Sequence, residues 1–129
     1  RLREYVDSVV YAIDTGRISC VAHPDILRYT GTDMGSYYDE MSRLIDASVK
    51  RNIPLEYNLL GAAAGRAYPR REFFEEVGRR GGKVIIGCDA HEPWRVGRKE
   101  EIDRAYKELQ SIGVAVVETM DLIPPFFGL

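Results

Sequence analysis

The chain has 129 residues, of which 45% are hydrophobic and 29% charged, and its net charge is −2 at pH 7. This length and composition predict one globular unit with a sizeable core, and the charge pattern gives no support for a nucleic-acid or membrane-surface partner. No apolar run approaches the roughly 20 residues of a membrane-spanning helix.

In chain order, the spacing of apolar residues predicts four helices that alternate with four short strands. The predicted helices cover about residues 2–15, 37–51, 69–80 and 99–111, and the predicted strands cover 18–22, 53–58, 84–86 and 114–117. Residues 25–36 and 59–68 are predicted loops, and residues 120–129 are a predicted irregular tail packed on the body. The almost continuously apolar strands favour parallel βα units, of which four make half a barrel or one open sheet.

The strongest local pattern is the apolar run at residues 84–86, which leads to Asp89 and His91. In extended chain, residues i and i+2 project to the same side, so the carboxylate and the imidazole are expected to converge. An oxygen ligand beside a nitrogen ligand suits a borderline divalent metal such as zinc, manganese or iron. A hydrogen-bonded Asp–His pair without metal is the alternative that this pair alone leaves open.

Three successive predicted strands end in side chains that could bind a metal ion. The carboxyl ends of parallel strands lie on one face of the sheet, where barrel and open-sheet sites are built. This placement favours a metal or catalytic site over coincidence. The residues concerned are His23, Glu56, Asn58, Asp89 and His91.

For four residues near these strand ends, we favour a role in the fold over a role in the site. Asn58 could orient a ligand, but pairing with a neighbouring loop is the simpler role, and Asp25 is expected to cap or hold backbone. Cys20 and Cys88 lie in apolar runs without CxxC spacing. This pattern is typical of reduced thiols in the core of a cytoplasmic protein. Because no serine or cysteine lies in a nucleophile motif, a metal-activated water is the better nucleophile hypothesis.

Several arginines lie on loops or helix starts that leave the same face. Guanidinium groups match phosphate oxygens bidentately. Arg66 is the best candidate because it follows a small-residue segment that lets a ligand approach closely, and Arg28 is the second candidate. Arg70 and Arg71 are expected at solvated positions on the first turn of the following helix. Arg95 and Arg98 follow His91 closely and could also face phosphate, but a surface role is the one that we favour for each.

Four motifs between residues 18 and 93 together resemble the polymerase and histidinol phosphatase (PHP) family, the histidinol-phosphate phosphatase branch most of all. The motifs are Val-Ala-His-Pro-Asp at 21–25, Leu-Glu-Tyr-Asn at 55–58, Gly-Arg with Tyr-Pro at 65–69, and Gly-Cys-Asp-Ala-His at 87–91. Their order and spacing carry the resemblance, and the Asp-Ala-His after an apolar strand is the most specific of them.

The resemblance implies a distorted barrel of seven β/α units around two or three divalent metal ions (Mn, Zn or Fe). Such enzymes hydrolyse phosphate esters with a metal-bound hydroxide. By resemblance, His23, Asp89 and His91 are metal ligands, and Asp89 is also catalytic because it steers the nucleophilic water or accepts its proton. Arg66 and Arg28 are by resemblance the residues that bind the substrate phosphate.

The chain also departs from the family pattern. The family's opening His-x-His motif, a further histidine and a bridging glutamate are missing, since the only histidines are His23 and His91. Glu56 has no ligand role in the pattern. Residue 1 is Arg and the first predicted helix has no N-terminal cap. We therefore expect residues 1–129 to be one domain, the C-terminal half of a (β/α)7 TIM-like barrel, and to be inactive alone.

The expected function of the intact protein is metal-dependent hydrolysis of a small phosphate ester in the cytoplasm, such as histidinol phosphate in histidine biosynthesis. One alternative is a non-catalytic assembly domain with a decayed metal site. Another is a different PHP branch that acts on nucleotides. Because a half barrel exposes its edge strands, at residues 18–22 and 114–117, we expect a homodimer or coverage by the chain's own termini, particularly residues 124–129.

Overall fold

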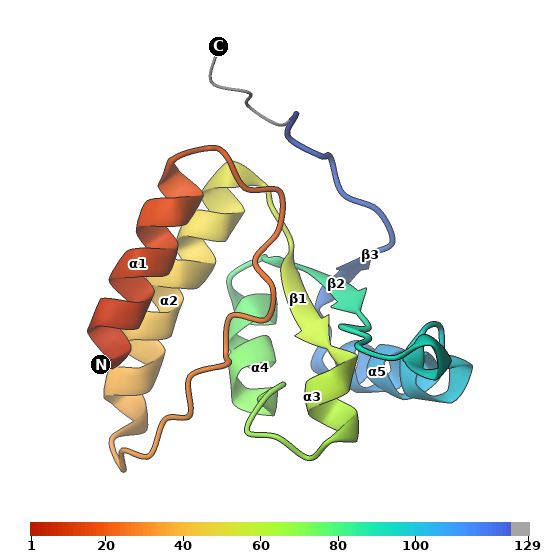
Figure 1. Cartoon of the computed structure of the whole chain (residues 1–129). Helices are drawn as coiled ribbons and strands as arrows, with labels where there is room; N and C mark the ends of the chain where they lie inside the picture. Colours follow the sequence, from red (N-terminus) through yellow and green to blue (C-terminus); the bar gives the residue numbers. More distant parts are fainter. Residues whose placement is uncertain (125–129) are drawn as a thin grey trace.

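The structure is a computed structural model that describes residues 1–124, and it contains a three-stranded parallel sheet in the order β1-β2-β3 (Figure 1). The strands are β1 (Leu55–Asn58), β2 (Lys83–Gly87) and β3 (Ala115–Val117). The helices are α1 (Leu2–Asp14), α2 (Met34–Arg51), α3 (Leu59–Ala63), α4 (Arg71–Arg79), the 3₁₀ helix η1 (Pro93–Arg95) and α5 (Lys99–Ile112). This architecture confirms the predicted α/β class with parallel strands. Within the described chain, every helix is too short or too polar to cross a membrane.

One face of the sheet packs against the helices. Leu55 of β1 is in register with Val84 of β2, which is in register with Val116 of β3. These side chains join a core to which α1, α2, α4 and α5 contribute. The helices contact one another in that order, and Figure 1 shows α1 lying beside α2. The largest helix residues that are fully buried in this core are Val6, Ile13, Tyr37, Met41, Leu44, Ile45, Phe73, Phe74, Val77 and Leu109.

The opposite face of the sheet is only half-buried. Successive residues of a strand point to opposite faces of the sheet. The residues that follow Leu55, Val84 and Val116 therefore lie on this face, and they are Glu56, Ile85 and Val117. Glu56 is thus a carboxylate on the less covered side of the sheet, close to the carboxyl end of β1. This position makes it available to the site described below.

Capping residues determine where the two longest helices, α2 and α5, begin or end. Asp33 precedes α2, and its Oδ1 accepts a hydrogen bond from the backbone N–H of Ser36 at 3.3 Å. This cap explains why α2 begins at Met34, three residues before the predicted start. Asn52, with a φ of 56°, and Gly113, with a φ of 81°, end α2 and α5 in the left-handed conformation.

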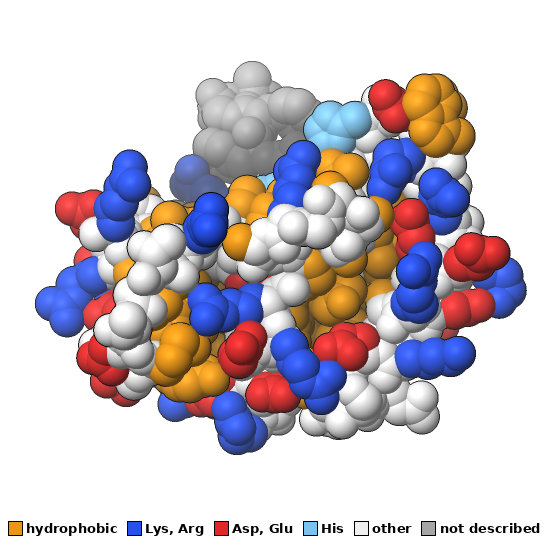
Figure 2. All heavy atoms as spheres, turned by 90° about the horizontal axis from the view of Figure 1, so that it is seen from below, with side chains coloured by type: hydrophobic (Ala, Val, Ile, Leu, Met, Phe, Trp, Pro, Cys, Tyr) orange, Lys and Arg blue, Asp and Glu red, His pale blue; other side chains and the backbone are white. Residues whose placement is uncertain are grey.

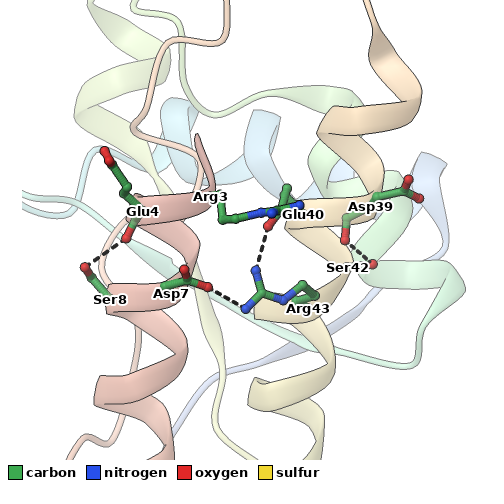
Figure 3. Close-up of polar contacts among 8 residues, drawn as sticks. All are labelled: Arg3, Glu4, Asp7, Ser8, Asp39, Glu40, Ser42 and Arg43. Atoms are coloured by element: carbon green, nitrogen blue, oxygen red, sulfur yellow. Dashed lines mark hydrogen bonds and ion pairs between the residues drawn. The ribbon is translucent and has the colours of Figure 1, made fainter. Parts of the chain in front are cut away.

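Exposed ion pairs join α1 to α2 (Figure 3). Arg43 of α2 pairs with Asp7 of α1 and with Glu40 one turn earlier on its own helix, and Arg3 of α1 also reaches Glu40, at 2.9 Å. Each exposed pair contributes about 0–1 kcal/mol. The association of α1 and α2 therefore depends mainly on the apolar residues between them.

The predicted strand at residues 18–22 is wrong in extent. Only Val21 forms a β-bridge, with Leu55, on the side of β1 away from β2. The N–H of Val21 donates to the carbonyl of Pro54 at 3.2 Å. Pro54 itself has no N–H with which to continue the ladder toward the start of the strand. After Ala22 the chain leaves the extended conformation, because His23 has a φ of 72°.

The predicted loop at 59–68 and the start of the following helix also differ from the structure. The first residues of that loop form α3, because the side chain of Asn58 caps it by accepting from the N–H of Gly61 at 2.8 Å. The next helix, α4, begins at Arg71 rather than at the predicted residue 69. Small residues in this segment therefore build one turn of helix against the end of β1.

The tail after β3 returns across the amino ends of the strands. The N–H of Ile123 donates to the hydroxyl of Ser19 at 2.8 Å. A pocket of about 330 Å³ at this end is lined by Ser19, Lys83 and tail residues such as Met120. The tail up to residue 124 contacts the body at Ser19 but stays exposed at residues 121–124, so the predicted packing is only partly seen, and the rest of the tail lies outside the described residues.

Candidate functional site

Asn58 is the centre of a hydrogen-bonded cluster at the carboxyl ends of β1 and β2. Its side-chain nitrogen Nδ2 lies 3.1 Å from Oε2 of Glu56 and 3.1 Å from Oδ2 of Asp89. Its side-chain oxygen accepts from the N–H of Gly61, so the orientation of the amide is determined by its partners. Asn58 is only 1% exposed. One buried amide therefore fixes two carboxylates from neighbouring strands.

The side chain of Glu56 lies across Gly87 at the end of β2. A Cβ atom added to Gly87 would lie 2.0 Å from Oε1 of Glu56, which no side chain could tolerate. Glycine is thus required at this position for Glu56 to adopt its observed place.

Burial raises the cost of the ionised form of Glu56. Burial raises the pKa of Glu56 and the nearby carboxylate of Asp89 adds to this, while the hydrogen bond from Asn58 and the proximity of His23 act in the opposite direction. Burial also raises the pKa of the Cys20 thiol to about 11, and the charge of Glu56 contributes. Cys20 and Cys88 form no disulfide with each other, and both are only partly buried rather than in the predicted core position. A cation between these carboxylates would relieve their repulsion.

Two of the predicted ligands have left-handed backbone conformations. His23 has a φ of 72° and Asp89 a φ of 48°, which non-glycine residues adopt at a cost of about 1–3 kcal/mol each. Neighbouring contacts hold His23: the hydroxyl of Tyr5 donates to the carbonyl of Pro24 at 2.7 Å, and the Tyr68 ring lies 6.1 Å from the His23 ring. Strained residues of this kind cluster at functional sites.

Asp25 connects the His23 segment to the start of α4. Its carboxylate, 2% exposed, accepts a hydrogen bond from the backbone N–H of Arg70. Burial raises the pKa of Asp25 to about 6, and the Arg70 hydrogen bond partly opposes this. The expectation that Asp25 holds backbone is confirmed. Arg70 is not simply solvated, because its guanidinium lies 4.6 Å from the centre of the Tyr37 ring.

His91 lies close to Asp89, but its nearer contact is with the backbone carbonyl of Asp89 rather than with the carboxylate. The argument from extended chain is wrong here, because β2 ends at Gly87 and Asp89 is left-handed. Nδ1 of His91 lies 2.8 Å from the backbone carbonyl of Asp89 and 3.8 Å from its Oδ1. The His91 side chain is 71% exposed. It lies at the surface, in the wall of a neighbouring pocket.

That pocket has a volume of about 360 Å³ and lies between α3 and the loop after β2. Its apolar side is formed by Leu60, Ala63 and Ala64. Its polar side is formed by Arg66, His91, Glu92 and Arg95. Figure 2 views the molecule from this end of the strands and shows many Lys and Arg side chains among acidic and apolar ones, with histidine near one edge.

The two arginines predicted to bind phosphate lie in different places. Arg66 lines the pocket beside His91, and its Nη1 donates to the hydroxyl of Tyr68 at 2.7 Å. Arg28 instead lines a pocket of about 250 Å³ with residues such as Arg1 and Leu2. The structure therefore brings Arg66, but not Arg28, into one pocket with His91.

The donor types at this end of the sheet suit a divalent metal, but the arrangement supplies an incomplete set of ligands. Among residues 1–124, no three His, Cys, Asp or Glu side chains form a group that could hold a metal ion by themselves. Glu56 interacts electrostatically with both His23 and Asp89, whereas His91 lies in the pocket wall. Glu56 and Asp89, held together by Asn58, offer two carboxylates, and His23 interacts electrostatically with Glu56, but the three do not form a complete ligand group among the described residues.

Sequence reasoning missed two features of this site. The bridging role of Asn58 depends on the register of β1 with β2, although its i, i+2 spacing from Glu56 indicated a shared side of the strand. Arg95 was expected at the surface, and only the turn at η1 brings it to the pocket. Comparison of the chain with protein-family models and with curated proteins gave no match.

Proposed function

We propose that this chain is the C-terminal part of a metal-dependent phosphoesterase of the PHP family, similar to the histidinol-phosphate phosphatases. The observation that carries the proposal is the pairing of Glu56 with Asp89 through Asn58, close to His23, at the carboxyl ends of parallel strands. Carboxylate and imidazole side chains are ligand types that divalent cations such as zinc and manganese accept. Three of the four sequence motifs that resemble the family contain these four residues.

The proposed complete fold is a distorted (β/α)7 barrel of which this chain forms the C-terminal half. Two features support it. Val21, β1, β2 and β3 neighbour one another in chain order, and all these pairings are parallel. The helices pack on one face of the sheet, while the face with Glu56, Ile85 and Val117 is half-buried, as the inner face of an incomplete barrel would be.

In this proposal His23, Asp89 and His91 hold metal, Glu56 adds a carboxylate, and residues outside positions 1–124 complete the shell. A divalent metal such as Mn, Zn or Fe would supply a Lewis acid and lower the pKa of bound water. Asp89 is the proposed catalytic residue. Asn58 occupies its Oδ2, and Oδ1 lies 3.8 Å from Nδ1 of His91. Oδ1 is therefore the atom that can accept a proton from the attacking water.

The proposed substrate is a small phosphate ester, histidinol phosphate by resemblance, with nucleotides as the alternative from another branch of the family. Arg66 is the proposed phosphate-binding residue because it lines the same pocket as His91. Arg28 remains a second candidate from the resemblance, although it lines a separate pocket.

The test measures metal content and phosphate release from histidinol phosphate, with manganese or zinc added. It compares this chain, the protein extended upstream, and the extended protein carrying Asp89→Asn. We expect tight metal binding and turnover in the extended protein only, and loss of both with Asp89→Asn. An extended protein that binds no metal and releases no phosphate would contradict the proposal.

A second candidate function is a non-catalytic assembly domain with a decayed metal site. The observation in its favour is that Asn58 already satisfies both carboxylates, while the described residues contain no three-residue metal group. The outer edge of β3, which has no strand partner among residues 1–124, would then serve to pair two copies. This candidate predicts a homodimer with no metal at any concentration of manganese or zinc, and sedimentation with metal analysis distinguishes the two.

A further inference from the structure

The pocket between α3 and the loop after β2 combines positive charge with an apolar side. Arg66 comes from the segment after α3, and His91 and Arg95 come from the loop that follows β2. Segments that follow two neighbouring parallel strands thus meet in one small cavity, next to Asp89.

We propose that this pocket takes the phosphate group of the substrate and that Arg95 binds it together with Arg66. The inference rests on the phosphoesterase function proposed above and extends it to a residue that the sequence placed at the surface. The pocket's volume of about 360 Å³ is near the small end of the range for ligand sites, which suits a small monoester.

The side chains of the pocket favour an oxyanion. Two guanidinium groups and one acidic side chain, Glu92, leave the wall with an excess of positive charge. Nδ1 of His91 lies 2.8 Å from the carbonyl of Asp89 and donates to it, so Nε2 can donate to a phosphate oxygen only when the imidazole is protonated. Guanidinium groups bind phosphate oxygens through paired N–H donors. The small apolar residues of α3 offer contact for the carbon skeleton of an ester.

Arg95 is held near the pocket by a loose ion pair. Its Nη2 lies 3.7 Å from Oε1 of Glu101 on α5, and its side chain is 22% exposed. Nε of Arg98 lies at the same distance, 3.7 Å, from the same oxygen. Both arginines share the Glu101 partner, but Arg95 lines the pocket and Arg98 does not. Arg98 is therefore a matched control for Arg95.

The experiment titrates inorganic phosphate into the metal-free chain, with a chelator present, and follows backbone amide resonances. The variants are Arg95→Gln, Arg98→Gln and Glu92→Gln. We expect Arg95→Gln to raise the dissociation constant of phosphate roughly threefold to tenfold, as for the loss of a charged hydrogen bond in a partly solvated site. Arg98→Gln should change it less than about twofold, and Glu92→Gln should lower it by removing a negative charge.

Equal effects of Arg95→Gln and Arg98→Gln would overturn the inference, as would weaker binding in Glu92→Gln. Absence of saturable phosphate binding to the unsubstituted chain would overturn it too. Since the titration contains no metal, it is independent of hydrolysis. If phosphate binding depends on Arg95 while the extended protein hydrolyses nothing, the proposed function fails and the phosphate pocket stands.

Discussion

Asn58 and Asp89 are 31 residues apart in the sequence, and their side chains are joined by a hydrogen bond of 3.1 Å at the ends of neighbouring strands. The same nitrogen of Asn58 also donates to Glu56 at 3.1 Å. A neutral amide thus fixes two carboxylates that would otherwise repel each other. In the proposed enzyme, this amide positions the ligands of the metal.

Asn58→Asp should destabilise the chain strongly, because it replaces the bridging donor with a third carboxylate at a buried position. We expect the free energy of unfolding at neutral pH to fall by about 2–4 kcal/mol, from unmade hydrogen bonds and an unpaired buried charge. Urea denaturation measures this. Asn52→Asp, at the exposed C-cap of α2, is the matched control and should cost no more than about 1 kcal/mol, because it places a negative charge at a helix C-terminus. Equal losses in the two variants would show that the bridge has no special role.

Gly87→Ala should displace Glu56, since the added methyl group would lie 2.0 Å from its Oε1. We expect a loss of about 1–3 kcal/mol in the free energy of unfolding. The loss should shrink when Glu56→Ala is introduced as well, because the clashing side chain is then absent. A double-mutant cycle measures this coupling, and purely additive effects would contradict the contact. Gly78→Ala in α4, where a Cβ meets only ordinary contacts at 3.6 Å or more, is the control and should be neutral or stabilising.

Deprotonation of Asp25 should lower the free energy of unfolding as the pH rises from about 4 to about 6. Burial raises the pKa of Asp25 from 3.8 to about 6, so the folded chain binds this proton more tightly than the unfolded chain does. The stabilisation from this proton is therefore complete below the pKa of Asp25 in the unfolded chain. It is lost as the pH rises through the pKa of Asp25 in the folded chain.

Asp25→Asn keeps an acceptor for the N–H of Arg70 and removes the titration. Its free energy of unfolding, measured between about pH 4 and pH 8, should fall less steeply with pH than that of the unsubstituted chain. Asp39→Asn, on the exposed side of α2, should leave the slope unchanged. An unchanged slope in Asp25→Asn would contradict the prediction.

The sequence predicts the main elements of this fold because their apolar patterns are long. The helices at Met34–Arg51 and Lys99–Ile112 and the strand at Lys83–Gly87 lie close to their predicted places. The strand at 18–22 fails because of Pro54 in its neighbour, a pairing that a local pattern does not contain. The helix α3 was missed because its cap is a side chain of the preceding strand.

The site is less predictable than the fold. The strand-end rule correctly brings Glu56, Asn58 and Asp89 together, because it depends only on parallel order. It does not predict the left-handed backbone at His23 and Asp89, nor that Nδ1 of His91 lies nearer to the backbone carbonyl of Asp89, at 2.8 Å, than to its Oδ1, at 3.8 Å. Such conformations are imposed by surrounding contacts rather than by the residues themselves.

The most direct test of the central claim is the location of bound Mn²⁺ on this chain. The measurement is paramagnetic broadening of backbone amide resonances at increasing Mn²⁺, in the unsubstituted chain and in Asp89→Asn, with Asp39→Asn as control. The account predicts weak binding, with broadening centred on His23, Glu56, Asp89 and His91 and abolished by Asp89→Asn alone. Broadening centred elsewhere, or equal in Asp89→Asn and the unsubstituted chain, would contradict it.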